Sequence, residues 1–225
     1  MSLNIPVIKR LVVKDWQLFR KQLALYVLAG FVALCFLGLA KPWAFYVGSL
    51  TLLIVLVSAA CFSISTSLVV ERKEQTLAFV MSLPVSPLDF TVAKLVGNLA
   101  TFLVPFVVML VGALAVVLFT PLPDGLFVYT LLIFAWLLFA FAISLAVAMS
   151  VESEGWATFA MIGSMVLINP YIMALGQIPA ISGRVEQDAI VWTTPALAII
   201  ATLVALAVAI IAATTWHHAR KPAFY

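Results

Sequence analysis

The sequence predicts an all-α, polytopic membrane protein with six transmembrane helices. Of its 225 residues, 65% are hydrophobic and only 9% are charged, whereas a soluble domain is about half apolar and about a quarter charged. The apolar residues gather into long runs, and a helix needs about 20 apolar residues to cross a bilayer. When the runs are counted as spans, most basic residues fall in the connecting and terminal segments on one side of the membrane. This distribution is typical of a multi-pass protein.

The first predicted element is an amphipathic interfacial helix over residues 5–21. Polar and basic side chains recur every three or four positions, which places them on one face of a helix: Arg10, Lys14, Gln17 and Lys21. The apolar side chains lie on the opposite face: Ile8, Val12, Trp16 and Phe19. This pattern is typical of a helix that lies flat on the membrane before the first span. The alternative is that the basic segment only fixes the orientation of the protein.

Six apolar runs are long enough to span the membrane. They cover residues 23–40, 43–69, 97–119, 126–149, 156–175 and 196–216. Proline, glycine and charged residues separate them, as at Lys41-Pro42 and in the stretches 121–125 and 152–155. The chain is therefore treated as one transmembrane domain over residues 1–225.

The longest polar interruption, residues 70–96, is predicted to be two helical pieces rather than an open linker. The sequence Leu83-Pro84 ends the first piece, because a residue before proline is pushed out of the helical region. Ser86, Pro87 and Asp89 then have the chemistry of a new helix start: a cap, a first-turn proline and a capping-box acid.

The fifth apolar run is interrupted by Asn169-Pro170, and further glycines and prolines follow it. Irregular backbone at membrane depth persists only when it is buried in protein or lines a water-filled cavity. Residues 171–194 are therefore predicted to form short outer or re-entrant helices. The alternative is a proline kink followed by a surface loop.

The distribution of basic residues predicts that both termini are cytoplasmic. Six spans place both ends of the chain on one side, and ten of the twelve basic residues then share that side: Lys9, Arg10, Lys14, Arg20, Lys21, Arg72, Lys73, Lys94, Arg220 and Lys221. Only Lys41 and Arg184 fall on the other side. The side with the excess of basic residues is normally the cytoplasm.

The sequence carries no pattern of an enzyme. No glycine begins a phosphate-binding GxxxxGK[ST] loop, and neither a zinc-protease HExxH motif nor a CxxC pair occurs. His217 and His218 are adjacent, so a helix would point them about 100° apart and away from a common metal. We therefore expect no catalytic residue, metal or cofactor in this chain. No basic stripe interleaved with aromatics indicates nucleic acid.

The middles of the spans also lack Asp, Glu, Lys and Arg. Ion-coupled transporters usually keep such groups inside the membrane, because a relay needs a titratable or coordinating side chain. This favours a transport protein whose energy comes from another chain. A secondary transporter or channel, and a membrane assembly or scaffold protein without cargo, remain alternatives of a different class.

The polar segment 70–96 resembles the first cytoplasmic loop of ABC-2 type permeases, the membrane subunits of type-2 ATP-binding-cassette transporters. The resemblance is carried by an acid–base pair, a Gln-Thr-Leu step, a Leu-Pro turn with a hydroxyl, and a lysine entering the third span: Glu71-Arg72, Gln75-Thr76-Leu77, Leu83-Pro84 with Ser86, and Lys94. Many members have glycine where this chain has Gln75. The flat N-terminal helix, six spans and broken segment before the last span also resemble the family.

The resemblance implies that 70–96 is a coupling loop on which a separate cytoplasmic ABC ATPase docks. That partner would bind ATP and Mg, and the docking residues would be Glu71, Arg72, Lys73, Glu74, Gln75, Leu77, Met81 and Leu83. Glu152 and Glu154 are candidates for a second contact, with a plain turn as the alternative. A solvated loop without a partner is the alternative for 70–96.

The resemblance further implies a location in the bacterial inner membrane and pairing with a second copy or a related permease. The resemblance also implies export rather than import, and because the lining lacks charge, an amphipathic or hydrophobic cargo is expected. A haem-exporter-like permease of cytochrome c maturation is an alternative within the class. Three strong hydrogen-bonding side chains within or near the spans could contact cargo or instead join helices: Asn98, Asn169 and Gln177.

Overall fold

The computed structural model describes residues 4–69, 87–151 and 153–219. Every regular element in these ranges is helical, and six of the described helices are long and apolar enough to cross a membrane. The prediction of an all-α, multi-pass membrane protein is therefore confirmed. The described elements are α1 (Ile5–Gly38), α2 (Pro42–Ile64), the π-helical turn η1 (Ser65–Val69), α5 (Pro87–Phe119), α6 (Leu126–Ser150), α7 (Glu154–Val166), α8 (Ile168–Gly176), α9 (Pro179–Ser182) and α10 (Thr194–Ala219).

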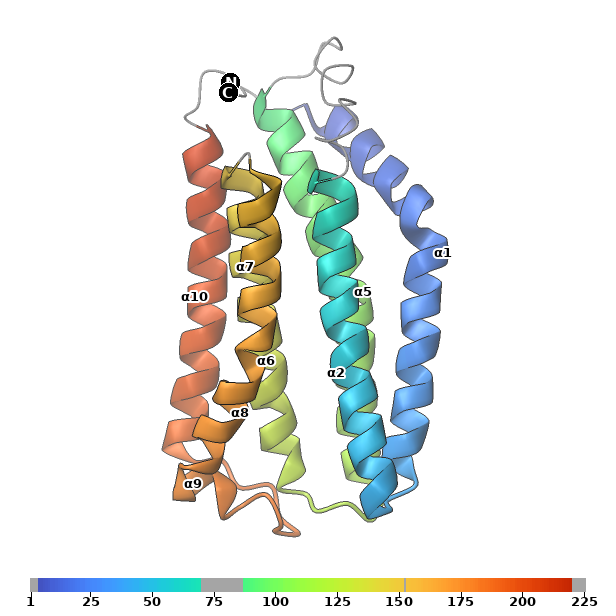
Figure 1. Ribbon diagram of the computed structural model, residues 1–225, viewed down its shortest axis with the longest axis vertical. Coiled ribbons are helices and arrows are strands. Elements are labelled where there is room, and N and C mark those ends of the chain that lie inside the picture. The colour runs from blue at the N-terminus through green and yellow to red at the C-terminus, as the bar shows by residue number, and fades with distance from the viewer. Residues whose placement is uncertain (1–3, 70–86, 152, 220–225) are drawn as a thin grey trace.

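The long helices stand side by side and run up and down (Figure 1). The start of α1, η1, the start of α5, the start of α7 and the end of α10 lie at one end, here called the loop end (Figure 1). The turns 39–41 and 120–125, together with α9, lie at the opposite end, here called the far end. Among the described basic residues, only Lys41 and Arg184 belong to the far end.

The structure differs from the expectation at the N-terminus. Residues 5–21 and the first span form one continuous helix, α1, rather than two elements. The junction 20–24 reads Arg-Lys-Gln-Leu-Ala, which is composed of strong helix formers without glycine or proline, so nothing interrupts the helix. The first turns of α1 nevertheless lean away from the direction of its remainder (Figure 1).

The helix start proposed for the loop is confirmed, because α5 begins at Pro87 with Asp89 in its first turn. The expected span of 97–119 therefore occupies only the later part of a longer helix. The expected end of the second span at residue 69 coincides with the end of η1. The first helical piece of the loop lies outside the described residues.

The fifth span is broken, but two residues before the expected point. The helix axis changes at Leu167, where α7 ends and α8 begins, rather than at Asn169. A proline removes the hydrogen bond to the carbonyl four residues earlier and crowds that preceding turn. Pro170 thus acts on Val166, which is the last residue of α7. The short helices α8 and α9 occupy the beginning of the expected segment 171–194.

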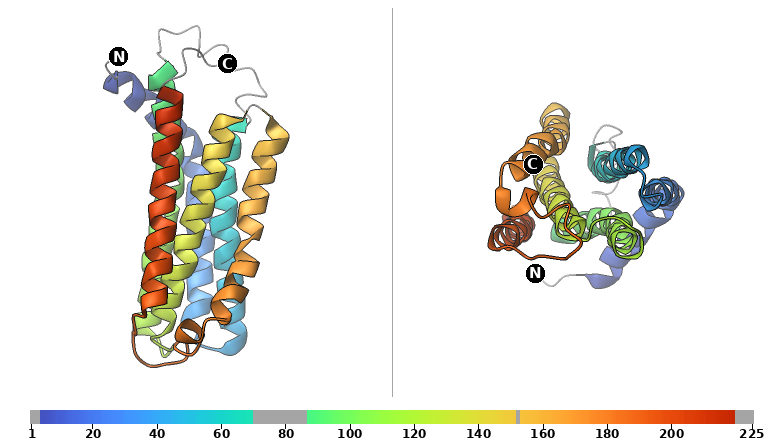
Figure 2. Two further views of the ribbon diagram at one scale, coloured as in Figure 1. Left: turned by 90° about the vertical axis from the view of Figure 1, so that its left-hand side faces the viewer. Right: turned by 90° about the horizontal axis from the view of Figure 1, so that it is seen from below.

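The helices pack mainly as two groups (Figures 1 and 2). Helix α1 packs on α2 and α5, which together form the first group, and α6 packs on α7 and α10, which together form the second. Close packing in the first group is possible because Gly48 of α2 has no side chain: a methyl group there would lie 2.8 Å from the carbonyl oxygen of Ala33.

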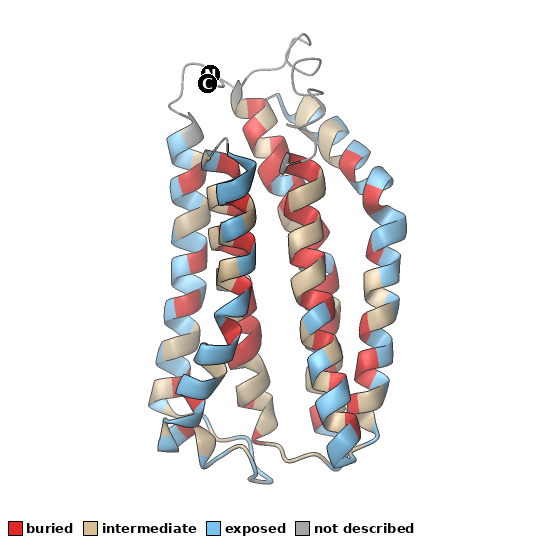
Figure 3. Ribbon diagram, in the orientation of Figure 1, coloured by how far each residue is buried: buried red, intermediate tan, exposed pale blue. Residues whose placement is uncertain are grey.

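Aromatic rings take part in the contact between the two groups. Phe102 of α5 stacks on Phe141 of α6 with ring centroids 4.0 Å apart, and Phe106 contacts the ring of Phe134 at 5.2 Å. Buried residues line the surfaces that the helices turn toward one another, whereas much of the outer surface is exposed (Figure 3). Because that outer surface carries many large apolar side chains, it is suited to lipid rather than to water.

Candidate functional site

The candidate functional site is a buried ion pair at the loop end, close to where residues 70–86 join the bundle. The ammonium group of Lys94, in the second turn of α5, lies 3.0 Å from Oδ2 of Asp15 in α1. Both side chains are more than nine-tenths buried, at 6% and 7% exposure. Charged side chains are almost never this buried unless they are paired.

The local sequence explains how Asp15 comes to be inside. It is the only acidic residue in the first 40 positions, and it lies on the apolar stripe of α1 together with Phe19 and Leu23, both of which are buried. Burial of this stripe against α5 carries the carboxylate into the interior. The more exposed Lys14 also approaches Asp15, with Nζ 3.8 Å from Oδ1. The ring of Phe90 lies 5.8 Å from the Lys94 ammonium.

One helical turn further along α5, Asn98 joins α5 to α2. Its Oδ1 accepts hydrogen bonds from Oγ of Ser63, at 3.1 Å, and from Oγ of Ser67, at 2.8 Å. Its Nδ2 donates to the backbone carbonyl of Lys94 at 2.8 Å. Asn98 itself is 1% exposed. The amide thus accepts from two buried hydroxyl groups, and the Ser63 hydroxyl also lies 3.2 Å from the backbone carbonyl oxygen of Asn98.

Ser67 belongs to η1, the π-helical turn that ends the described part of this segment. A π-helical turn inserts an extra residue into the helical repeat, and such turns occur frequently at functional sites. Here the turn keeps the hydroxyls of Ser63 and Ser67 on the side that faces Asn98.

A further contact ties the beginning of α1 to the beginning of α5. Oδ1 of Asp89 accepts a hydrogen bond of 2.8 Å from the backbone N–H of Asn4, and Asp89 is 5% exposed. A carboxylate at this position also stabilises the positive end of the α1 dipole. Asp89, Lys94 and Asn98 therefore connect α5 to α1 and α2 at three successive levels of the helix.

The arrangement positions helices rather than supplying catalytic chemistry. Among the described residues, no group of three His, Cys, Asp or Glu side chains is close enough to hold a metal ion. The carboxylates are engaged by a cation or by a backbone N–H. What the network provides is a rigid connection between three helices at the end of the bundle that carries the loop.

The residues predicted from the sequence do not form one cluster. The docking candidates from Glu71 to Leu83, and also Glu152, lie outside the described residues, so their role stays a prediction. Glu154 is exposed in the first turn of α7 at the loop end. Asn98 lies inside the buried network, where the helix-joining alternative is what the geometry supports.

Asn169 and Gln177 lie apart from this network. Asn169 is exposed on α8, and Gln177 is exposed directly after that helix, toward the far end. The structure therefore does not bring the three candidate cargo residues together within one subunit.

Sequence reasoning missed the ion pair and the two serines. Asp15 is a single acid on an otherwise apolar helix stripe. This pattern could have predicted a buried ion pair, because a buried carboxylate needs a partner. The spacing of Lys94 and Asn98, four residues apart, likewise places two polar groups on one face of α5. Their pairing with Asp15 and Ser63 depends on tertiary packing and has no local signal.

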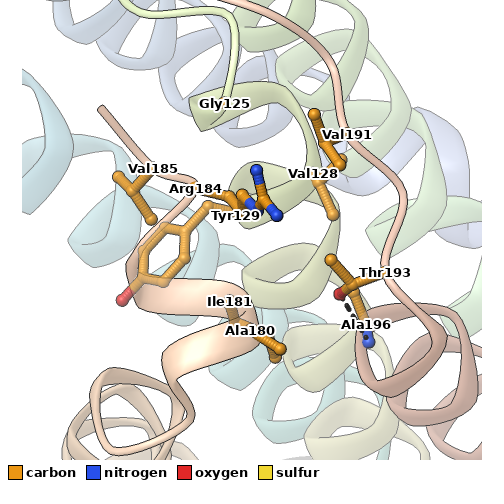
Figure 4. A pocket seen from close by; sticks show the side chains of 10 residues that line it. All are labelled: Gly125, Val128, Tyr129, Ala180, Ile181, Arg184, Val185, Val191, Thr193 and Ala196. Atoms are coloured by element: carbon orange, nitrogen blue, oxygen red, sulfur yellow. Dashed lines mark hydrogen bonds between the residues drawn. The ribbon is translucent and has the colours of Figure 1, made fainter. Parts of the chain in front are cut away.

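At the far end, the chain between α9 and α10 is fastened to the start of α6 (Figure 4). The N–H of Gly125 donates to the carbonyl of Gln187 at 2.9 Å, and Nη1 of Arg184 donates to Oε1 of Gln187 at 3.0 Å. A methyl group at Gly125 would lie only 1.9 Å from the carbonyl oxygen of Arg184. The cavity beside Tyr129, shown in Figure 4, has a volume of about 10 Å³, which is room for no more than one water.

Comparisons of the chain with protein-family models, with curated proteins and with solved structures found no match. The fold and the site define the class as a multi-pass helical membrane protein.

Proposed function

We propose that the chain is the membrane permease subunit of an ABC transporter of the ABC-2 type, exporting an amphipathic or hydrophobic cargo. A separate ATPase subunit, docked on the 70–96 loop, would bind ATP and Mg and supply the energy. The observation that carries the proposal is the buried network at the loop end, which joins the two helices that flank the loop to each other and joins α5 to α1.

The network supports a lever mechanism. The loop leaves α2 through η1 and enters α5 at Pro87, so a force on the loop reaches both helices. Asn98 joins these two helices to each other, and the Lys94–Asp15 pair joins α5 to α1. A displacement of the loop would therefore move α1, α2 and α5 as one unit.

The contact between the two helix groups is suited to such a movement. The network and its ion pair lie within the first group, whereas the groups meet through rings such as Phe102 on Phe141. Packed apolar surfaces can slide by small amounts without breaking a hydrogen bond, as in shear movements of helices. ATP binding by the partner would then shift the population between two arrangements of the groups.

Under this proposal the loop end faces the cytoplasm of a bacterial cell, and both termini are cytoplasmic. A second copy, or a related permease, would complete the path for cargo. The exposed position of Glu154 at the loop end is compatible with a second contact to the ATPase. A haem-exporter-like permease would also need an ATPase and a second permease subunit, so only the identity of the cargo distinguishes it from the proposed exporter.

The docking claim is tested by pull-down of the cognate ATPase with the full-length chain. Reversing the charges of Glu71 and Glu74 together with Leu83→Asp is expected to abolish capture. Reversal of Glu186 and Asp188, which are exposed near the far end, serves as the matched control and should leave capture unchanged. Undiminished capture by the loop variant would refute docking on this loop.

One observation favours a second candidate, a secondary transporter. The buried Asp15 carboxylate is the kind of group that ion-coupled transporters use. Along α1, however, Asp15 lies about 35 Å from Gly38 at 1.5 Å per residue. That distance places it at the margin of a hydrocarbon core about 30 Å thick rather than at its centre. Vanadate-sensitive transport in proteoliposomes supports the permease, and vanadate-insensitive transport driven by an ion gradient supports the second candidate.

A further inference from the structure

The beginning of α1 carries an open groove at the loop end, here called the cationic groove. Its volume is about 460 Å³, which lies within the range of about 300–1,000 Å³ that is usual for sites that bind small ligands. Six residues line it: Pro6, Lys9, Arg10, Val13, Lys14 and Gln17. Their spacing of three or four positions places them on one face of the helix.

The cationic groove has an excess of positive charge. Within the described part of the chain, the side chains of Lys9 and Arg10 form neither an ion pair nor a hydrogen bond. The only acid of the first 40 positions, Asp15, is buried and lies 3.0 Å from Lys94, away from the groove. Lysine and arginine side chains only donate hydrogen bonds, so a ligand that fits the groove is an anion with acceptor oxygens.

The groove lies at the level of the lipid headgroups. Counted along α1 from Gly38 at the far end, Lys14 lies about 36 Å away and Lys9 about 44 Å away. The hydrocarbon core of a bilayer is about 30 Å thick, and the bilayer with its headgroups is about 40–45 Å thick. The cations therefore reach past the acyl chains into the headgroup layer at the loop end.

Apolar side chains accompany the cations on the surface of this part of α1. Val13, Trp16 and Leu18 are all exposed, and Val13 lines the groove itself. A soluble acidic partner would match the charges, whereas a membrane interface offers phosphates to the cations and acyl chains to the apolar groups. Tryptophan is also enriched at this level of membrane proteins. The combination favours a lipid over a soluble anion.

We propose that the cationic groove binds the headgroup of an anionic phospholipid in the leaflet at the loop end. The guanidinium of Arg10 can donate two parallel hydrogen bonds to one phosphate, which a lysine cannot do. Lys9 and Lys14 add positive charge on either side of it, and the Gln17 amide adds a neutral donor. Each Lys or Arg close to an anionic leaflet strengthens binding about fivefold.

A lipid bound in the groove would act on the helix that the buried network fastens. Lys14 lines the groove, and its ammonium lies 3.8 Å from Asp15 of the buried pair. The lipid would thus hold the beginning of α1 at the headgroups, while the Lys94–Asp15 pair holds the same turns on α5. The inference does not depend on the proposed function, because lipid binding needs neither an ATPase nor a cargo.

Native mass spectrometry of the full chain in neutral-detergent micelles, titrated with phosphatidylglycerol, tests the proposal. Lys9→Gln with Arg10→Gln removes two charges but leaves Lys14 and the buried pair in place. This variant is expected to raise the dissociation constant of the first bound lipid about 25-fold. Lys41→Gln with Arg184→Gln removes two exposed charges at the far end and should change that constant less than twofold. An unchanged constant in the groove variant, or equal losses in both variants, overturns the proposal.

Further arms separate the lipid from other occupants. The wild-type chain should bind phosphatidylglycerol more tightly than zwitterionic phosphatidylcholine, and excess inorganic phosphate should not displace it, because the free ion lacks acyl chains. Displacement by phosphate, or equal binding of the two lipids, overturns the proposal. If the groove variant keeps its lipid but no longer captures the ATPase, the groove belongs to the soluble partner and the proposal is equally overturned. Loss of ATPase capture by the loop variant with intact lipid binding refutes only the ATPase proposal.

A milder variant and a second measurement keep the proposal falsifiable if the double variant folds poorly. Arg10→Gln alone is expected to raise the dissociation constant about fivefold. Because a ligand of the folded state raises thermal stability, phosphatidylglycerol should increase the Tm of the wild-type chain more than that of Arg10→Gln. Lys41→Gln should respond as the wild-type chain does. An equal increase in Tm for Arg10→Gln and Lys41→Gln would place the bound lipid elsewhere and refute the assignment.

Discussion

Lys94→Met removes the ammonium group of the buried ion pair while keeping most of the volume of the side chain. Coulomb's law with an effective dielectric constant of about 20 gives an attraction of about 5.5 kcal/mol at the observed 3.0 Å. Part of this is offset because the ammonium no longer has to be desolvated. Breaking a buried pair by removing one partner costs about 3–5 kcal/mol in proteins.

Lys14 reduces the loss of stability that is expected for Lys94→Met. Its ammonium is 3.8 Å from Asp15, but the side chain is half exposed, so in a water-like dielectric its attraction is only about 1 kcal/mol. We therefore expect Lys94→Met to lower the free energy of unfolding by about 3 kcal/mol, at the lower end of the range for a broken buried pair.

The assay is reversible unfolding of the full chain in mixed micelles, with tryptophan fluorescence and circular dichroism as independent probes. The double variant Asp15→Leu with Lys94→Met replaces the pair by apolar groups, and such replacements are often neutral or stabilising. It should therefore recover most of the stability lost in the single variant. Lys41→Met, at the exposed far end, is the charge-removal control and should have no effect. If the effects of Asp15→Leu and Lys94→Met simply add, the two groups are not coupled and the reasoning fails.

Two further predictions use the same unfolding assay. Asn98→Leu removes the acceptor of the buried Ser67 hydroxyl and leaves the Ser63 hydroxyl with only the backbone carbonyl of residue 98, so it should cost about 2–4 kcal/mol, whereas Ser67→Ala removes a single hydrogen bond and should cost about 1 kcal/mol; equal losses would contradict the central place of the amide. Gly125→Ala would force a methyl group to within 1.9 Å of the carbonyl oxygen of Arg184, so the chain between α9 and α10 should detach and become more sensitive to protease. Gly38→Ala, whose methyl group would lie 4.0 Å from its nearest neighbour, should leave the cleavage rate unchanged, and equal sensitivity of the two variants would contradict the steric argument.

The sequence predicted those elements whose signals are local. The apolar run 126–149 corresponds to α6, Leu126–Ser150, because length and hydrophobicity alone define a span. The start of α5 at Pro87 was predictable from first-turn proline chemistry. By contrast, the change from basic to apolar residues near position 22 indicated a boundary that the helix formers at 20–24 do not create.

The site was less predictable, because its contacts join residues far apart in the chain. Asp15 and Lys94 are 79 positions apart, and Ser63 and Asn98 are 35 apart. Burial of α1 against α5 decides whether a lone acid on an apolar stripe meets lipid, solvent or a cation. The exposed state of Asn169 is equally a property of packing, since the same residue on the opposite face of α8 would have joined helices within the chain.

The positions of the inter-helix contacts and of the helix break determine which elements can move when a force acts on the loop. Within the first group, the buried network fastens three helices at the loop end, and the backbone contact beside Gly48 holds α1 on α2 nearer the far end. The second group contains the break at Leu167, and its helix α6 is fastened to the chain before α10 at the far end, beside Gly125. A displacement of the first group would therefore be absorbed where the helical hydrogen bonds are already interrupted, at the α7–α8 joint.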